Sequence, residues 1–522
     1  MSLQKRTIRP LLTWLFIFIA AAHCLLTQTH YFLNADVAFL TQMALFGQNG
    51  DLYTQYYEIN PPLIVFIYRL FLIPFELGWL AEVASLRVSM VIYLLLVFVG
   101  CHYYLAKLNT EKTELWLLAI ALSLLFVLPA AFLQREHIIA AAMMLYLCMM
   151  LCRLERRQTS IFIRATTATL AALAVCLKPQ YGLVLILLEL YYLAKERRLA
   201  LLFRWENILI AMVGTSYISY VYFAHPYYFQ VVAPLASKTY IAYFEQTTNL
   251  LLRTVLLLLL LLLPFRYLKA RVQSPGMING VYLVAFAALG AFLAGRAGFS
   301  YHLVLSFTVL STLVLASLFF ALYEFVTRPH WKQAIPCGFF IAVLLFIRHF
   351  HFIDVDQVNY PRAVNQLMAQ NNELPTAPIE FESYKNIYDA VRQQTSPHSN
   401  IYVFGARLFP AHSIAIHLNQ KWIGRFPVLW ALPETLKEAD KQENKQRIEW
   451  IAQTVAEDIT NGKPEVILVE KSETLLRYPN GFDFIEHFEQ IPSFAKAFEP
   501  YQQIEVVPSV DSDWVLYKRV TP

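Results

Sequence analysis

Charged residues are scarce in this sequence. Only 15% of the 522 residues are charged and 57% are hydrophobic, whereas an average soluble domain carries roughly 25% charged residues. This scarcity excludes an ordinary cytosolic enzyme, a disordered chain and a coiled coil. Cysteine is also rare. All six cysteines lie in apolar segments, and none follows residue 352. The C-terminal part therefore offers no disulfide framework and no cysteine-type zinc site.

The few charges are unevenly distributed, although the formal net charge is only +5. Residues 1–352 hold 26 Lys and Arg against 14 Asp and Glu, whereas residues 353–522 hold 16 against 23. The first part is thus basic and the second acidic. This difference predicts two domains in different solvents, a transmembrane domain over 1–352 and a soluble domain over 353–522.

Twelve apolar stretches are candidates for membrane spans, which need about 20 mostly apolar residues each. The stretches are 11–30, 61–78, 86–106, 114–132, 138–152, 162–177, 181–194, 205–224, 249–265, 277–295, 302–326 and 334–352. Basic residues precede the first stretch, which we interpret as a retained helix rather than a removed signal peptide. Six clusters between stretches together hold 18 Lys and Arg, and the positive-inside rule assigns all six to the cytoplasmic side.

That assignment requires one early stretch not to cross the membrane. Stretch 61–78 is the best candidate because it contains Arg69, Pro74 and Glu76, and a charge near a helix centre is costly in lipid. We therefore expect an interfacial helix there, on the outer face. The predicted fold is a polytopic α-helical membrane protein with about 11 transmembrane helices. Its N-terminus would be cytoplasmic and its C-terminal domain periplasmic.

The C-terminal domain is predicted to be a compact α/β structure. Two apolar runs rich in β-branched residues, 400–406 and 463–470, are typical of buried strands. Between them, residues 433–462 begin at a proline and end at Asn-Gly, which predicts a helix. Segments 504–509 and 514–519 are expected to form a terminal strand pair.

Polar residues gather in five stretches that this topology places at the outer face. The long first loop, from about Tyr31 to Asn60, contains Asp36, Asp51 and Glu58 and no Lys or Arg. The others are 134–137, 178–181, 225–229 and 295–302. Carboxylates and cations beside a hydrophobic wall suit a substrate with an anionic head and a lipid tail.

Each of these elements also has a purely structural interpretation. Asp36 could cap the apolar helix that follows it, and residues 135–137 could form a local ion pair in a loop. Lys178 could be an interfacial lysine whose charged end reaches the membrane surface. The order and common sidedness of the set favour a functional interpretation.

Short motifs within these stretches resemble the GT-C superfamily of membrane glycosyltransferases. The similarity is to the bacterial branch of protein-mannosyltransferase and aminoarabinose-transferase homologues. Asp36, in NADVAF, stands where that superfamily has an acidic catalytic residue after the first span. The other matching segments are Gly50–Tyr53 before Pro61-Pro62-Leu63, QREH at 134–137, LKPQY at 177–181, GFSYH at 298–302 and GRFPVLWALP at 424–433.

The resemblance implies transfer of a sugar, with inversion, from a polyprenyl-phosphate carrier to a glycan, lipid or protein acceptor. The site would face the periplasm at the bacterial inner membrane, with no nucleic acid as a partner. Asp36 is the expected general base and Glu136 a second catalytic residue that orients the acceptor or a cation. The expected substrate- and phosphate-binding residues are Arg135, His137, Lys178, Arg296, Tyr301, His302, Glu58 and Asn60.

The chain departs from the family pattern at two positions. The aminoarabinose transferases have a lysine before their PPL motif, whereas this chain has Asn60. Lys178, Arg296 or Arg135 must then meet the phosphate. Val37 and Ala38 follow Asp36, so no DxD or paired acidic motif begins at Asp36; no cofactor is predicted, and a divalent metal stays open.

Two other classes of protein fit part of the pattern. A lipid-linked sugar flippase or transporter would also have many spans and outer-face charges, but such proteins commonly show repeat symmetry and broken helices. An envelope scaffold would use the outer domain for binding and would not require Asp36 or Lys178.

Overall fold

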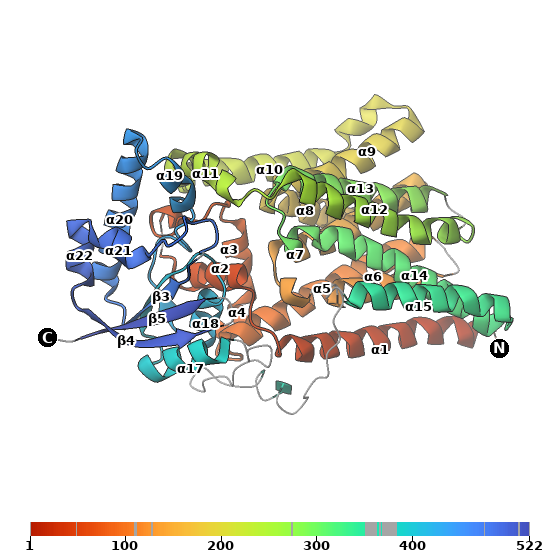
Figure 1. Ribbon diagram of the computed structural model, residues 1–522. Helices are drawn as coiled ribbons and strands as arrows, with labels where there is room; N and C mark the ends of the chain where they lie inside the picture. The colour runs from red at the N-terminus through yellow and green to blue at the C-terminus, as the bar shows by residue number, and fades with distance from the viewer. Residues whose placement is uncertain are drawn as a thin grey trace. The chain divides into compact units, whose positions relative to one another are not determined.

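The computed structural model describes residues 2–48, 50–108, 112–126, 129–272, 275–349, 363–364, 367, 384–473, 475–509 and 512–520 (Figure 1). Their contacts divide the chain into two compact units. Unit 1 comprises Met1–Gln28, Arg87–Ile218 and Glu245–Asn359; unit 2 comprises Thr29–Leu86, Ser219–Phe244 and Tyr360–Pro522. The predicted domain boundary after residue 352 lies outside the described residues.

Unit 1 is built from long apolar helices. Seven helical segments in the described chain are long and apolar enough to cross a membrane: Pro10–Gln28, Glu82–Lys107, Arg135–Leu154, Trp205–Ala224, Thr247–Lys269, Gly276–Gly295 and Ser300–Thr327. The complete helices are α1 Ser2–Gln28, α5 Glu82–Lys107, α6 Thr113–Phe126, α7 Arg135–Leu154, α8 Ile161–Leu177, α9 Gly182–Glu196, α10 Trp205–Ala224, α12 Thr247–Lys269, α13 Pro275–Gly295, α14 Val304–Thr327 and α15 Trp331–His349. These helices confirm a polytopic membrane protein.

Two helices form the centre of unit 1. Both α7 and α14 are almost entirely buried. They contact each other, and both also pack on α6 and α13. Apart from the charged residues at the two ends of α7, both helices consist mainly of apolar and small hydroxyl-bearing residues, as expected for helices that other helices enclose. Shorter apolar helices, α6, α8 and α15, overlap the predicted stretches 114–132, 162–177 and 334–352.

Unit 2 contains the stretch that charge arguments excluded as a span. It forms two short helices, α3 Leu63–Phe71 and α4 Ile73–Glu76. At 1.5 Å per residue, nine residues extend roughly 14 Å, about half of a hydrocarbon core. The Arg69 side chain donates to the carbonyls of Ala44 at 3.2 Å and Gly47 at 3.0 Å, so this charge stabilises the end of a neighbouring helix.

That neighbouring helix, α2 Ala35–Phe46, lies within the segment that we described as a long loop. Its sequence is apolar, and Asn34 caps its first turn. The loop assignment was therefore wrong over these residues. Unit 2 also contains the single turn η1 Leu52–Thr54 and, in its middle segment, η5 Tyr228–Val232, α11 Ala233–Thr239 and η6 Tyr240–Tyr243.

The C-terminal part of unit 2 forms a five-stranded sheet in the order β2-β1-β3-β5-β4 (Figure 1). The strands are β1 Asn400–Phe404, β2 Lys421–Trp422, β3 Val466–Lys471, β4 Tyr501–Pro508 and β5 Asp513–Arg519. β1 is parallel to β2 and β3, whereas β5 is antiparallel to β3 and β4. The two predicted buried strands and the terminal strand pair are thus confirmed.

Alternating side chains of β1 reach the two faces of the sheet. Ile401 and Val403 join a core with α17 Lys385–Gln394 and α18 Ala411–His417. Phe404 contacts rings of α21 Phe484–Glu489 and α22 Pro492–Phe498. The predicted helix 433–462 is divided into α19 Leu432–Lys437 and α20 Gln442–Gly462. The Asn444 side chain donates to the Glu438 carbonyl at 3.0 Å and stabilises the turn between them.

Candidate functional site

Three residues far apart in the sequence form a buried ion cluster in unit 1. The Lys178 ammonium donates to Glu136 Oε1, and also to His302 Nε2 at 3.1 Å. His302 Nε2 lies 3.5 Å from the same Glu136 oxygen. All three side chains are buried, and Glu136 is fully enclosed. Because burying ions costs free energy even when they are paired, such a cluster in a membrane protein points to function.

Helix ends bring these three side chains together. Glu136 lies in the first turn of α7, where the helix dipole favours a negative charge. Lys178 is the residue directly after α8, and Pro179 comes next. Because proline cannot continue a helix, α8 ends before Lys178. His302 lies in the short turn η7 Ser300–Leu303, which leads into α14. Helix ends and one short helical turn thus position the cluster.

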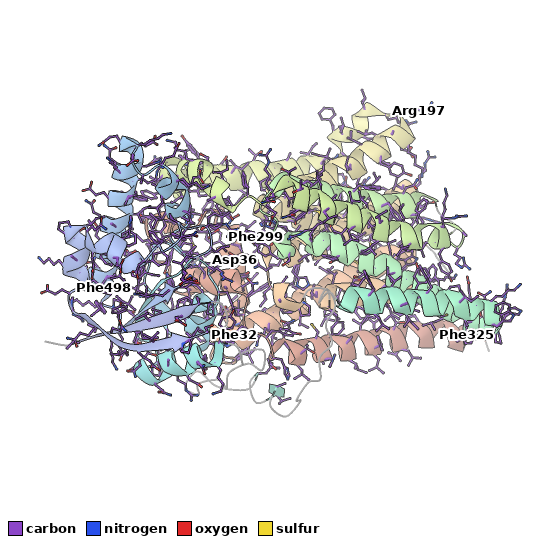
Figure 2. The ribbon with its side chains drawn as sticks, in the orientation of Figure 1. Phe32, Asp36, Arg197, Phe299, Phe325 and Phe498 are labelled. Atoms are coloured by element: carbon purple, nitrogen blue, oxygen red, sulfur yellow. The ribbon has the colours of Figure 1, made fainter. Side chains whose placement is uncertain are left out.

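Aromatic rings surround the Lys178 ammonium. Its Nζ lies 5.4 Å from the centre of the Tyr301 ring, a cation–π distance. Tyr301 stacks on Phe299, which Figure 2 labels, with ring centres 5.4 Å apart. The Tyr181 hydroxyl donates to the His302 carbonyl at 3.0 Å. Because Lys178, Glu136 and His302 are all buried, their charges are poorly screened by solvent.

Two buried atoms of the cluster have unused hydrogen-bonding capacity. Within the described part of the chain, neither Glu136 Oε2 nor His302 Nδ1 has a hydrogen-bond partner. Buried polar atoms normally have one. A bound hydroxyl group or water fits the Glu136 oxygen.

The other predicted residues of unit 1 differ in their placement. Arg135 is buried beside the cluster, and its charge acts on His302. His137 is buried, but its Nε2–H donates to the Leu124 carbonyl at 2.7 Å. It therefore anchors the start of α7. Arg296 is exposed, and its own carbonyl accepts from the Glu245 N–H at 2.9 Å.

Asp36 belongs to unit 2, where it lies in the first turn of α2 (Figure 2). Its backbone N–H donates to Asn34 Oδ1 at 3.1 Å. Asn34 is thus the N-cap, and the Asp36 carboxylate does not serve as one. Asp36 is half-buried. Its backbone is fixed by the helix, and part of its side chain is exposed.

Residues near the C-terminal sheet hold the segment that precedes Asp36. The Leu33 N–H donates to His417 Nε2 at 3.2 Å, and the Leu33 carbonyl accepts from the Ser413 hydroxyl at 2.8 Å. Further along α2, the Gln42 side chain donates to the Gln420 carbonyl at 2.8 Å and accepts from the Trp422 N–H at 3.2 Å. Four hydrogen bonds thus fix the helix that carries Asp36.

His412 lies between α2 and the sheet as a neutral imidazole. Its Nε2–H donates to the Pro427 carbonyl at 2.6 Å, and its ring contacts Phe39 and Trp422. Burial lowers the pKa of His412 to about 3, although the Pro427 hydrogen bond and the charge of Asp36 oppose this change. Asp36 is thus close enough to the buried His412 for its charge to affect the pKa of that histidine.

Glu58 and Asn60, both predicted to bind substrate, contact each other. Glu58 Oε1 accepts from the Asn60 backbone N–H at 3.0 Å and also from the Asn60 side chain. The Asn60 carbonyl accepts from the Tyr53 hydroxyl. These bonds give the two residues a local structural role in the turn before Pro61.

Asp51, from the same acidic loop, joins two separate segments of unit 2. Its carboxylate accepts from the N–H of Tyr53 at 2.9 Å and of Tyr227 at 2.8 Å. It also lies 3.5 Å from His225 Nδ1. Asp51 therefore has a structural role, since it holds these two segments together.

No protein-family description and no curated protein matches this sequence. The structure of ArnT from Cupriavidus metallidurans bound to undecaprenyl phosphate is similar, with a TM-score of 0.52 and 13% identity. The similarity covers 99% of this chain and 98% of that one. This chain has the GT-C fold. The resemblance inferred from the motifs is confirmed at the level of the fold.

Two further solved structures resemble the chain less closely. ArnT in the apo state is 12% identical over 96% of this chain and 97% of its own, with a TM-score of 0.48. The oligosaccharyltransferase AglB from Archaeoglobus fulgidus, in complex with an inhibitory peptide and a dolichol-phosphate, is 12% identical. That match covers 94% of this chain and 72% of AglB, with a TM-score of 0.43.

The described residues of this GT-C fold contain no group of three or more His, Cys, Asp or Glu side chains placed to hold a metal ion. The described part of the chain therefore identifies no set of metal ligands.

Sequence reasoning missed the residues that hold α2. Ser413, His417 and Gln420 are ordinary polar residues in an unremarked segment, and their partners lie more than 370 residues away. His225 was noted only as the first residue of the polar stretch 225–229. The sequence carried no signal that paired it with Asp51.

Proposed function

We propose that the protein is an inverting membrane glycosyltransferase with a polyprenyl-phosphate-linked sugar as its donor. The acceptor is a glycan, lipid or protein hydroxyl at the periplasmic face of the bacterial inner membrane. The observation that carries this proposal is the buried Lys178–Glu136–His302 cluster, in a chain whose fold resembles an undecaprenyl phosphate-bound ArnT over 99% of its length. The C-terminal domain lies in the periplasm and the N-terminus in the cytoplasm.

Lys178 and His302 serve the leaving group. Negative charge develops on the carrier phosphate as the bond between the anomeric carbon and the phosphate oxygen breaks. A preorganised cation in a site that excludes water stabilises such charge. Lys178 is held in place before the donor arrives, since Glu136 and His302 fix its ammonium. Arg135 adds a second positive charge beside this cluster.

Asp36 serves the acceptor. Its carboxylate removes the proton from the attacking hydroxyl, whose oxygen forms the new bond to the anomeric carbon on the face opposite the phosphate. A positioned general base typically accelerates a reaction by 10² to 10⁴-fold. Glu136 orients a sugar or acceptor hydroxyl, because its Oε2 lacks a partner among the described residues.

Transfer from a radiolabelled polyprenyl-phosphate sugar tests the assignment of Asp36. We expect Asp36→Asn to lose transfer by at least about 10²-fold, while the folded protein still binds the carrier lipid. Glu76→Gln is the matched control, because Glu76 is an exposed carboxylate in the same unit. Full activity of Asp36→Asn would remove Asp36 from the mechanism.

The same assay separates the enzyme from the other two classes. Release of label from the lipid supports a transferase, whereas movement of intact lipid across a vesicle membrane without release supports a flippase. A scaffold would do neither. Either of the last two results in purified, folded protein overturns the proposed function.

A further inference from the structure

A second set of buried charges lies at the opposite end of α7 from Glu136. Arg153 is in the last turn of α7, Arg164 is near the start of α8, and Arg204 directly precedes α10. Arg153 follows Glu136 by 17 positions, which corresponds to roughly 25 Å of helix. These arginines are therefore distinct from the proposed donor site, and nothing in the proposed transfer reaction uses them.

Two carboxylates join the three arginines. Glu206 Oε1 accepts from Arg153 Nη2 and from Arg164 Nη1, the latter at 2.9 Å. Both Glu189 oxygens accept from Arg204 Nη2 at 2.5 Å, and Glu189 Oε1 also accepts from the Tyr146 hydroxyl at 2.8 Å. Three guanidinium groups thus face two carboxylates, which leaves one uncompensated positive charge.

The cluster also has unused hydrogen-bonding atoms of both kinds. Arg153 Nε, Arg164 Nε and Arg204 Nη1 are buried donors without a partner in the described chain, and Glu206 Oε2 is a buried acceptor in the same condition. Unsatisfied buried donors are costly. A ligand that carries both anionic oxygens and hydroxyl groups would satisfy both kinds of atom.

The surface beside the arginines is apolar. Phe162, two residues before Arg164, and Phe203, immediately before Arg204, are each 77% exposed. Leu199 and Ile161 are exposed as well. Arg197, at the turn after α9, adds exposed positive charge (Figure 2). Exposed apolar residues next to basic ones are typical of contact with the acyl chains and anionic head groups of a bilayer.

We infer that Arg153, Arg164 and Arg204 form a binding site for the head group of an anionic phospholipid with hydroxyls, such as phosphatidylglycerol. The phosphodiester accepts from the guanidinium groups, and a glycerol hydroxyl donates to Glu206. The acyl chains lie along Phe162 and Phe203. Arg164 is the entry point for the head group, since its side chain is 24% exposed.

Native mass spectrometry of the detergent-purified full chain tests this site. We expect the protein to retain phosphatidylglycerol and to release phosphatidylcholine of the same acyl composition. Arg164→Gln should lower phosphatidylglycerol retention about tenfold, because it removes one charge-assisted hydrogen bond. Arg328→Gln is the matched control, as Arg328 is an exposed arginine of the same unit, and it should retain the lipid.

Three results would overturn the inference. They are equal retention of the two lipids by the wild type, unchanged retention in Arg164→Gln, and displacement of the lipid by millimolar inorganic phosphate, which would identify a site for a free anion. If Arg164→Gln does not fold, Arg204→Gln provides the same comparison. The measurement reads lipid binding alone, so its outcome is independent of whether the protein transfers a sugar.

Discussion

The two compact units hold their buried polar groups in different ways. Unit 1 pairs full charges between helices, as in Lys178 with Glu136 and Arg204 with Glu189. Unit 2 contains such a pair too, Arg425 with Asp458, but it also buries neutral groups against backbone carbonyls, as in His412 with Pro427 and the Trp430 indole with Tyr57. A charge that loses its partner inside a helical bundle costs far more than a neutral donor that loses one. Substitutions at buried polar residues should therefore affect unit 1 more strongly than unit 2.

The largest effect is expected at Lys178. In Lys178→Met, the Glu136 carboxylate loses its main partner, which should reduce the free energy of unfolding by about 3–5 kcal/mol and abolish transfer. In the double variant Lys178→Met with Glu136→Gln, no bare charge remains, so stability should largely return while transfer stays absent. Thermal unfolding and the radiolabel assay measure the two quantities separately.

The double variant separates the effect of the unpaired charge on stability from the loss of two groups that transfer is proposed to need, Lys178 and Glu136. If stability and transfer return together, Lys178 serves only to neutralise Glu136, and the leaving-group role is wrong. If stability does not return, the destabilisation of Lys178→Met arises from lost packing and not from the unpaired charge of Glu136.

The ion pair of Arg425 with Asp458 in unit 2 provides the second test. Arg425 donates through Nε to Asp458 Oδ1 at 2.7 Å, but it also bonds to Glu457 and to the Thr454 carbonyl. In Asp458→Asn, Arg425 keeps these other partners, so we expect a loss of about 2 kcal/mol in the free energy of unfolding. A loss equal to that of Lys178→Met would remove the contrast between the units.

The sequence predicted local structure, such as helices and long strands, better than it predicted contacts between distant residues. Hydropathy identified the long helices of unit 1, because a helix that spans a bilayer needs about 20 mostly apolar residues. The charges of Arg69 and Glu76 excluded 61–78 as a span, and the structure gives two short helices there. The strands of the C-terminal sheet followed from β-branched runs, but the two-residue β2 did not, since so short a strand has no periodicity.

The members of the candidate site were predictable, but most of their partners were not. Motif resemblance singled out Glu136, Lys178 and His302, which the structure brings together. The sequence could not show that Glu58 and Asn60 bond to each other. Nor could it show that Ser413 and His417 hold the start of α2, because hydrogen bonds over such separations leave no local pattern.

Acid should weaken unit 2 through His412. Burial lowers the pKa of His412 to about 3, whereas an unfolded histidine titrates near 6.5. Between these values the unfolded state binds the proton and the folded state does not, so stability is lost as the pH falls below about 6.5. At pH 5.5, one pH unit below the pKa of an unfolded histidine, the free energy of unfolding should be lower by roughly 1.4 kcal/mol.

The difference in melting temperature between pH 7.5 and 5.5 measures this effect. His412→Gln keeps a donor for the Pro427 carbonyl but does not titrate, and it should show a smaller difference than the wild type. An equal pH dependence in both proteins would assign the acid sensitivity to other groups.

The smallest effect is expected at Ser413, and it tests whether unit 2 positions Asp36. Ser413→Ala removes one neutral hydrogen bond to the Leu33 carbonyl, which should cost about 1 kcal/mol of stability. Because Leu33 lies three residues before Asp36, kcat should fall while KM for the donor stays unchanged. Ser237→Ala is the control, since its hydroxyl donates only to the nearby Pro234 carbonyl. A rise in KM with an unchanged kcat would show that this contact serves donor binding, and the division of roles between the two units would then be wrong.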